Sequence, residues 1–206
     1  MKPTLLFYCQ HALGIGHLTR SFALAHALSG HFQVVLLNGG LFPKGLRAPE
    51  GVTVIDLPPL GLKDGHELVS QGSLDLAQAK QVRHDMLLEA LARHSPDVLL
   101  IELFPFGRKK FAYELLPLLK AARRLVPRPQ VVCSVRDILV TSRADSQHHD
   151  DRARWIAQRY FDSVLVHADP SLVRFSESFH PRRALDTPVL YTGFVLGHRS
   201  PEIAHR

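Results

Sequence analysis

The segment Thr4-Leu5-Leu6-Phe7-Tyr8-Cys9-Gln10-His11-Ala12-Leu13-Gly14-Ile15-Gly16-His17-Leu18 decides the fold. Its unbroken apolar run, Thr4–Cys9, predicts a strand that is buried on both faces of a sheet. A glycine-bearing turn follows, and from Leu18 to Leu28 apolar residues recur at helical spacing until Gly30 ends the pattern. A buried strand that leads through a turn into a helix indicates an α/β protein with a parallel sheet.

The same alternation of apolar runs and helical patterns continues outward from this unit, which predicts a Rossmann-like α/β fold with a mostly parallel sheet and helices on both faces. Further strands are expected at Phe32–Leu37, Val52–Leu57, Val98–Ile101, Gln130–Val135, Ser163–Val166 and Val189–Thr192, and further helices at Leu74–His94, Phe111–Leu125 and Asp145–Phe161. Pro117 predicts that the helix at Phe111–Leu125 is kinked or divided in two. The Gly- and Pro-rich stretch from Pro59 to Ser73 predicts a long, functional loop.

Length and composition limit the classes of protein. The chain has 206 residues, which suffices for one large domain but not for two Rossmann-like domains. Hydrophobic residues make up 46%, which is typical of a globular protein. The net charge of +6 fits a solvated basic surface, or attraction to anionic lipid head groups or to a phosphorylated ligand. No dense Lys/Arg run interleaved with aromatic residues supports nucleic-acid binding.

The cysteines and apolar segments bear on the cell compartment. Cys9 and Cys133 lie inside predicted strands, so we expect reduced core thiols rather than a disulfide or a metal pair. The first apolar stretch ends at Cys9, which is too short for a signal peptide, and no run approaches the roughly 20 residues that span a bilayer. A cytoplasmic protein is expected, with peripheral contact at the inner face of the membrane as an open alternative.

Peripheral membrane contact would depend on five apolar residues near Arg108-Lys109-Lys110. These five side chains could form a membrane-docking patch, or they could simply pack in the core. The set comprises Phe104, Phe106, Phe111, Leu115 and Leu116.

The turn Gly14-Ile15-Gly16-His17 is the first candidate site. Glycines allow a ligand to approach the backbone closely, and a helix N-terminus favours an anion. A nicotinamide-dinucleotide site would need a third glycine and an acidic residue where this chain has Thr19 and Asn38, so no cofactor is expected. His17 is either a general base for a hydroxyl or a histidine that only caps the helix.

Polar residues also follow three later strands, at the edge where α/β sheets bind ligands. Glu102 either orients His17 and binds hydroxyl groups or pairs with Arg108 or Lys109 at the rim. Arg136 and Asp137 either hold a phosphate and supply an alternative base or form an internal ion pair. After the strand that ends near His167, Asp169 and Pro170 read as the start of a helix.

The run His148-His149-Asp150-Asp151 raises the question of a metal site. Adjacent residues of a helix point about 100° apart and rarely share one ion. We therefore expect a solvated helical face and no metal.

The stretch His11-Ala12-Leu13-Gly14-Ile15-Gly16-His17-Leu18-Thr19-Arg20 resembles the first glycine loop of the MurG-like glycosyltransferases, which adopt the GT-B fold. Four further blocks resemble a bacterial group of predicted glycosyltransferases: Phe104-Pro105-Phe106-Gly107-Arg108, Ser134-Val135-Arg136-Asp137-Ile138-Leu139, His167-Ala168-Asp169-Pro170-Ser171-Leu172 and Tyr191-Thr192-Gly193-Phe194-Val195. The MurG-like loop carries more glycine ahead of its histidine, where this chain has His11-Ala12-Leu13.

The resemblance implies that residues 1–193 form the N-terminal, acceptor-side half of a GT-B enzyme and that residues 194–206 begin the linker to an absent, donor-binding C-terminal domain. It implies inverting transfer of a hexosyl group from a nucleotide-sugar to an acceptor hydroxyl, with a lipid-linked molecule or a polysaccharide as candidate acceptors. The fragment alone would be inactive. His17 is the expected base, with Asp137 and Glu102 as rivals, and the expected substrate-binding residues are Gly14, Gly16, Arg20, Glu102, Arg136 and Asp137.

Two alternatives stay open on the sequence alone. The chain could be a non-catalytic subunit that binds the acceptor or recruits a donor-binding chain to the membrane. It could also be half of a sugar-nucleotide epimerase, which shares the GT-B architecture and would need acidic catalytic groups in its cleft.

Overall fold

The computed structural model describes residues 1–11, 16–43, 45–65, 67–136 and 146–195. A seven-stranded sheet with the order β3-β2-β1-β6-β7-β8-β9 forms its centre, and every neighbouring pair in it is parallel. Its strands are β1 (Thr4–Cys9), β2 (Gln33–Asn38), β3 (Val52–Asp56), β6 (Val98–Glu102), β7 (Gln130–Arg136), β8 (Ser163–His167) and β9 (Val189–Tyr191). The predicted Rossmann-like α/β fold is confirmed, and the seven predicted strands match these within a residue or two.

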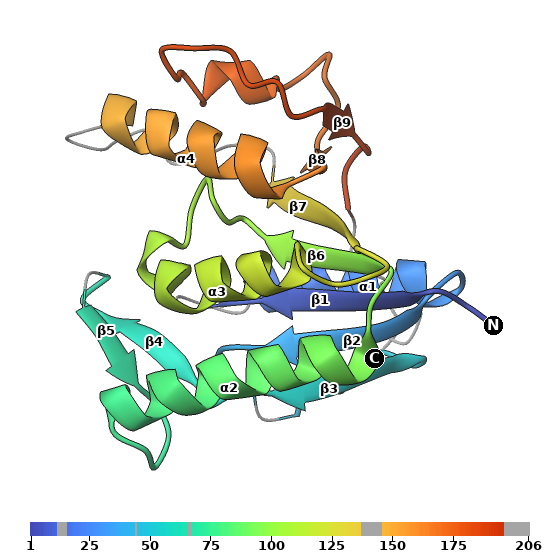
Figure 1. Cartoon of the computed structure of the whole chain (residues 1–206), viewed down its shortest axis with the longest axis vertical. Helices are drawn as coiled ribbons and strands as arrows, with labels where there is room; N and C mark the ends of the chain where they lie inside the picture. The colour runs from blue at the N-terminus through green and yellow to red at the C-terminus, as the bar shows by residue number, and fades with distance from the viewer. Residues whose placement is uncertain (12–15, 44, 66, 137–145, 196–206) are drawn as a thin grey trace, which may run out of the picture.

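Helices cover both faces of this sheet (Figure 1). On one face α1 (Gly16–Ser29) packs Leu18, Phe22 and Ala25 against the alternate side chains of β1 and β2. The opposite face is covered by α2 (Leu76–His94), α3 (Ala112–Ala122) and α4 (Ser146–Tyr160). Because both faces are covered, β1 and β2 are buried almost from end to end, which explains their unbroken apolar sequence.

Local signals in the sequence set the ends of α2. Asp75 accepts a hydrogen bond from the Gln78 backbone N–H at 2.8 Å, and the Gln78 side chain accepts one from the Asp75 N–H at 3.3 Å. This reciprocal pair is a capping box, which satisfies two backbone donors at the helix start. At the other end Ser95 adopts a left-handed conformation, and its N–H donates to the Leu91 carbonyl.

The helix after β6 is continuous despite its proline. Residues Lys109–Phe111 form a short 3₁₀ turn, η1, and α3 then runs through Pro117 without a break. Of the alternatives that the sequence left open, division into two helices is therefore wrong. The four apolar side chains of α3 that face the sheet outweigh one missing backbone hydrogen bond: Leu115, Leu118, Leu119 and Ala122 are all buried.

The expectation of an irregular loop at Pro59–Ser73 is wrong. β4 (Leu60–Lys63) and β5 (Glu67–Ser70) form an antiparallel hairpin, in which Leu60 pairs with Ser70 and Lys63 with Glu67. Asp64 and Gly65 turn the chain with φ angles of 49° and 72°. The strands are only four residues long, and Gly61 interrupts the alternation, so the sequence carried little strand signal.

The predicted helix start at Asp169 is also wrong. The Asp169 carboxylate accepts hydrogen bonds from the N–H and hydroxyl of Ser171, at 2.8 and 2.6 Å, which closes a tight turn. Beyond that turn the chain forms only the short 3₁₀ turn η2 (Phe175–Glu177) before β9. An aspartate that caps a turn and one that caps a helix use the same hydrogen bond, so sequence does not separate them.

The structure assigns the remaining apolar groups to the core. Phe104, Phe106, Phe111 and Leu115 are at most 2% exposed, so they form no membrane-docking patch. Cys9 and Cys133 are buried and unpaired, as expected of core thiols. Within the described parts of the chain, none of the helices is long and apolar enough to cross a bilayer.

Candidate active site

The order of the strands places the switch point of the sheet between β1 and β6. β1 lies between β2 and β6. The helix that follows β1 (α1) covers one face of the sheet, whereas the helix that follows β6 (α3) covers the other. In an open α/β sheet this reversal separates the connecting loops and leaves a ligand-binding crevice beside the strand ends. The start of α1 and the end of β6 flank the crevice, and they carry His17 and Glu102.

His17 and Glu102 form a hydrogen-bonded pair in this crevice. The Nδ1 of His17, in the first turn of α1, donates to the Oε1 of Glu102 at the end of β6. The side chain of His17 is 21% exposed and that of Glu102 is 9% exposed, so the imidazole reaches solvent while the carboxylate lies beneath it. Because Nδ1 donates, a neutral His17 keeps Nε2 as its proton acceptor. One of the two contacts that the sequence offered for Glu102, the contact with His17, is therefore present.

Arg108 lies on the other side of Glu102. Its guanidinium Nη2 is 3.7 Å from Glu102 Oε2, close enough for an ion pair but too long for a hydrogen bond. These atoms and Arg108 Nε are buried and have no hydrogen-bond partner among the described residues. Glu102 thus takes part in both interactions that the sequence presented as alternatives, and the Arg108 ion pair leaves two polar groups unsatisfied inside the site.

A tight loop brings Arg108 back to Glu102. Leu103 and Arg108 both have left-handed backbones, with φ angles of 65° and 56°, and the Gly107 N–H donates to the Leu103 carbonyl at 2.8 Å. A Cβ on Gly107 would lie 2.7 Å from the Leu103 side chain, which would have to shift to admit a larger residue. The peptide bond between Phe104 and Pro105 is cis. Left-handed non-glycine residues are uncommon and concentrate at functional sites.

His11 lies near the same pair. It is buried, its Nε2 is 3.1 Å from Asn38 Oδ1, and burial lowers its pKa, with the charges of Arg108, Glu102 and His17 acting on it as well. The Asn38 amide donates to Gly40 and Asp56, so its oxygen is the acceptor and His11 donates. A neutral His11 thereby joins the end of β2 to the chain that leaves β1.

A buried ionic network holds the carboxyl ends of β1, β2 and β3 together. Arg83 of α2 and Glu114 of α3 are both fully buried and share two hydrogen bonds, at 2.9 and 2.6 Å. Arg83 also donates to the carbonyls of Gly39 and Pro58 and to the side chain of Gln10. Burial alone would lower the pKa of Arg83, but the bonds to Glu114 raise it above its ordinary value. One cation therefore fixes the ends of β1, β2 and β3.

A second histidine marks the ends of β7 and β8. The Nε2 of His167 lies 2.8 Å from the Ser134 hydroxyl, and its Nδ1 lies 2.8 Å from the Thr192 hydroxyl. Thr192 donates to the Gly193 carbonyl, so it accepts from His167 Nδ1, and Ser134 donates to Nε2. Burial and the charge of Arg20 lower the pKa of His167 to about 4, which keeps the imidazole neutral.

The other predicted site residues are distributed around this edge. Gly16 is exposed at the start of α1, and Arg20, one turn further, lies near His167. Arg136 is exposed at the end of β7. Gly14 and Asp137 lie outside the described residues. His17 and Glu102 are thus in contact, and Arg20 lies near His167 at the same edge of the sheet.

The acidic run on α4 has a structural role that the sequence did not reveal. Asp150 is buried rather than solvated, and it accepts from the His180 N–H at 2.8 Å. Asp151 accepts from the Arg182 N–H at 2.7 Å, so both carboxylates anchor the segment before β9. In the part of the chain that the structure describes, no three His, Cys, Asp or Glu side chains are grouped as a metal ion requires.

Sequence reasoning missed His11, Arg108 as an unsatisfied cation, and the Ser134–His167–Thr192 chain. The sequence signal that could have found His11 and His167 is their position at the end of an apolar strand. Their buried partners come from distant segments, so the interactions depend on the register of the sheet.

Comparison with solved structures identifies the class of fold. TcCGT1 in complex with UDP matches with a TM-score of 0.62, at 12% identity over 100% of this chain and 54% of its own. A UDP-glucosyltransferase from Polygonum tinctorium gives 0.58, at 13% identity over 100% and 55%. Phytolacca americana UGT2 gives 0.56, at 17% identity over 95% and 55%. Neither a family model nor a curated protein sequence matches the chain.

These neighbours are GT-B glycosyltransferases, and the chain has the fold of one half of such an enzyme. It spans about half the length of the structures that it matches.

Proposed function

We propose that this chain is the acceptor-side half of a glycosyltransferase that transfers a hexosyl group from a nucleotide-sugar to an acceptor hydroxyl. The observation that carries the proposal is the hydrogen bond between His17 and Glu102 at the switch point of the sheet. A histidine with one nitrogen held by a carboxylate and the other facing solvent is suited to act as a general base.

The chemical step follows from this geometry. His17 Nε2 takes the proton of the acceptor hydroxyl as its oxygen attacks the anomeric carbon of the donor. The new oxygen–carbon bond forms on the side opposite the leaving nucleoside diphosphate, whose bond to that carbon breaks, so the configuration inverts. The carboxylate of Glu102 stabilises the imidazolium that results. The donor is bound by a second domain, and this chain alone is inactive.

The comparisons support the donor class. The names of two neighbouring structures include UDP and UDP-2-fluoro-glucose, and that of a third is a UDP-glucosyltransferase. The resemblance of the first loop to the MurG-like enzymes favours an acceptor that is lipid-linked or a polysaccharide. Membrane contact would then be peripheral and on the cytoplasmic side.

The test uses the protein as its gene encodes it, with candidate acceptors and a panel of UDP-, GDP- and TDP-sugars. Release of nucleoside diphosphate should require an acceptor and should fall by about 10²–10⁴-fold in His17→Ala, the range that general-base catalysis contributes. His31→Ala, at an exposed turn before β2, is the matched control and should retain activity. Turnover without an acceptor, with epimerised sugar as product, would instead support the epimerase reading. Absence of turnover until a donor-binding chain is added would support the two-chain reading.

A further inference from the structure

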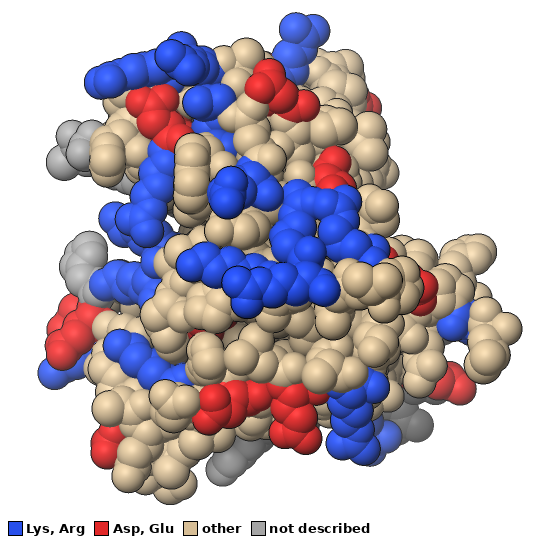
Figure 2. Space-filling model, viewed as in Figure 1, with Lys and Arg blue, Asp and Glu red and all other residues tan. Residues whose placement is uncertain are grey.

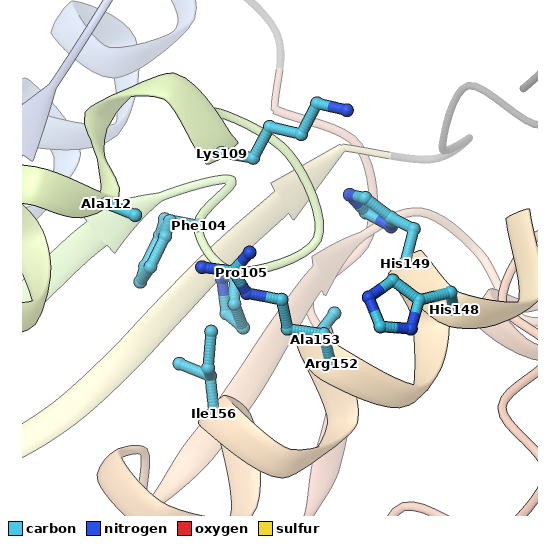
Figure 3. A pocket seen from close by; sticks show the side chains of 9 residues that line it. All are labelled: Phe104, Pro105, Lys109, Ala112, His148, His149, Arg152, Ala153 and Ile156. Carbon is cyan, nitrogen blue, oxygen red and sulfur yellow. The ribbon is translucent and has the colours of Figure 1, made fainter. Parts of the chain in front are cut away.

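A groove with a basic rim runs along the N-terminal ends of α3 and α4, on the side of the sheet opposite α1. It consists of two adjoining cavities of about 140 and 180 Å³, which share Lys109 and His149, and we call it the α3–α4 groove. Figure 3 shows the first cavity, with Lys109 on the α3 side and His148 and His149 on the α4 side. One water needs only roughly 10–15 Å³, so the groove can admit a small polar ligand.

The charge of this groove has one sign. Arg108, Lys109 and Lys110 come from the segment before α3, and Arg152 comes from α4. No Asp or Glu lines either cavity among the described residues. Figure 2 shows many Lys and Arg side chains over the part of this face that α3 and α4 cover, with Asp and Glu among them near the top of the view and also along its lower part.

The nearby carboxylates have partners of their own, and two of them contact groove residues: Asp150 lies 3.4 Å from His149, and Glu102 lies 3.7 Å from Arg108. Glu114 is buried against Arg83, and Asp150 and Asp151 accept from the backbone of residues 180 and 182. Within the described residues, the side chains of Lys109, Lys110 and Arg152 have no ion-pair partner.

The position of these cations is electrostatically unfavourable in the free protein. The N-terminus of a helix carries positive partial charge, and the first turn of α4 holds His148 and His149 but no acidic residue. Lys109 and Lys110 likewise precede the N-terminus of α3. Lys109, Lys110 and Arg152 thus add positive charge near both helix N-termini, where a bound anion would be favoured.

Arg108 also lines this groove. Its Nε and Nη2 are buried without a hydrogen-bond acceptor, although its side chain lines the second cavity. Its Nη2 is 3.7 Å from Glu102, too far for a hydrogen bond, so the guanidinium has donors that a ligand could satisfy. Its planar fork matches the oxygens of a phosphate.

We propose that the α3–α4 groove binds a dianionic phosphate group, held by Lys109, Arg152 and the free donors of Arg108. Arg108 also faces Glu102, so the groove adjoins the His17–Glu102 pair through one side chain. If the proposed transferase function holds, the phosphate and the reacting hydroxyl can belong to one ligand. The binding site itself does not depend on that function.

Titration calorimetry of the full chain with inorganic pyrophosphate tests the site without any transfer reaction. The double variant Lys109→Ala/Arg152→Ala should raise the dissociation constant at least about tenfold, since each charge-assisted hydrogen bond contributes that much. Lys120→Ala/Arg124→Ala removes the same charge from exposed positions at the other end of α3 and should change little. His17→Ala should bind pyrophosphate normally, which separates this site from the proposed catalytic base.

Sedimentation with phosphatidylcholine vesicles, with and without phosphatidic acid, distinguishes the source of the phosphate. Binding of free pyrophosphate that the groove variant loses supports a site for a soluble phosphorylated ligand. Binding only to phosphatidic acid vesicles, again lost in the groove variant, supports a lipid phosphate in the same groove. Equal loss in the groove and control variants, loss in His17→Ala instead, or no binding to either probe would overturn the proposal.

Discussion

Glu102 accepts a hydrogen bond from His17 Nδ1 across 85 residues of sequence, because the end of β6 and the start of α1 meet at the switch point of the sheet. The carboxylate is nearly buried, and its second oxygen faces Arg108 rather than water. Its charge is therefore available to stabilise a protonated His17, and its position fixes which nitrogen of the imidazole faces the crevice.

Glu102→Gln separates these two contributions. The amide oxygen can still accept from His17, but the negative charge that stabilises the imidazolium is gone, so kcat should fall by about 10²-fold or more with little change in KM. Steady-state kinetics of nucleotide release measure this. Glu89→Gln, at an exposed position of α2, is the matched control. Unchanged kcat in Glu102→Gln would mean that the carboxylate is only a structural partner of Arg108.

Gly16 offers a test of whether the first loop approaches a ligand. A Cβ built on Gly16 meets no atom within 4 Å, and its backbone is not left-handed, so the folded chain does not require glycine there. Gly16→Ala should leave the free energy of unfolding unchanged or raise it by up to about 1 kcal/mol, because alanine favours helix. The added methyl group would project into the open space beside His17, so KM for the acceptor should rise.

The control for this variant is Gly30→Ala, beyond the far end of α1, where the nearest atom to a new Cβ is 3.9 Å away. It should alter neither stability nor KM. Denaturant unfolding and steady-state kinetics on both variants give the comparison. If Gly16→Ala binds and turns over acceptor normally, the residue is no ligand contact.

The central elements could be predicted from sequence because each depends on local information. β1 and β2 are apolar over their central residues, since α1 covers one face and α2 and α3 cover the other. The position of Glu102 at the end of β6 and of His17 at the start of α1 also followed from the order of elements. The hairpin at Leu60–Ser70 could not be predicted, because its stability comes from pairing and packing rather than from an alternating pattern.

Long-range partners set a second limit. Arg83 lies in a helix whose sequence reads as ordinary and polar, yet its guanidinium contacts the ends of three strands. Nothing local distinguishes it from the solvated arginines of this chain. The chemistry of His11 and His167 is likewise decided by residues on other strands.

The Arg83–Glu114 pair predicts a large effect on stability. Glu114→Gln leaves a buried guanidinium without its counter-charge, which should lower the free energy of unfolding by about 3 kcal/mol or more. Glu177→Gln, at an exposed position, should change it by less than about 0.5 kcal/mol. Chemical denaturation measures both. Arg83→Met/Glu114→Leu removes both charges and should lose less than the sum of the two single variants; additive losses would contradict the assignment of a coupled pair.

His167 predicts the direction in which stability changes with pH. In the unfolded chain its imidazole titrates near 6.5, whereas burial, with Arg20, lowers its pKa to about 4 in the folded protein. Above pH 6.5 both states are neutral and the residue contributes no pH dependence. Between pH 6.5 and 4 the unfolded state binds the proton first, so the free energy of unfolding falls, by at most about 3 kcal/mol from this residue.

His167→Gln should therefore flatten the loss of stability between pH 6.5 and 4, while lowering stability at pH above 7 because the bonds to Ser134 and Thr192 are weakened. The flattening should be partial, since burial also lowers the pKa of His11 and acts in the same direction. Urea unfolding at a series of pH values measures the slope, with His31→Gln as an exposed control. If the slopes of His167→Gln and the unmodified protein coincide, His167 is protonated in the folded state at these pH values, and its Nε2 would donate to the Ser134 hydroxyl instead of accepting from it.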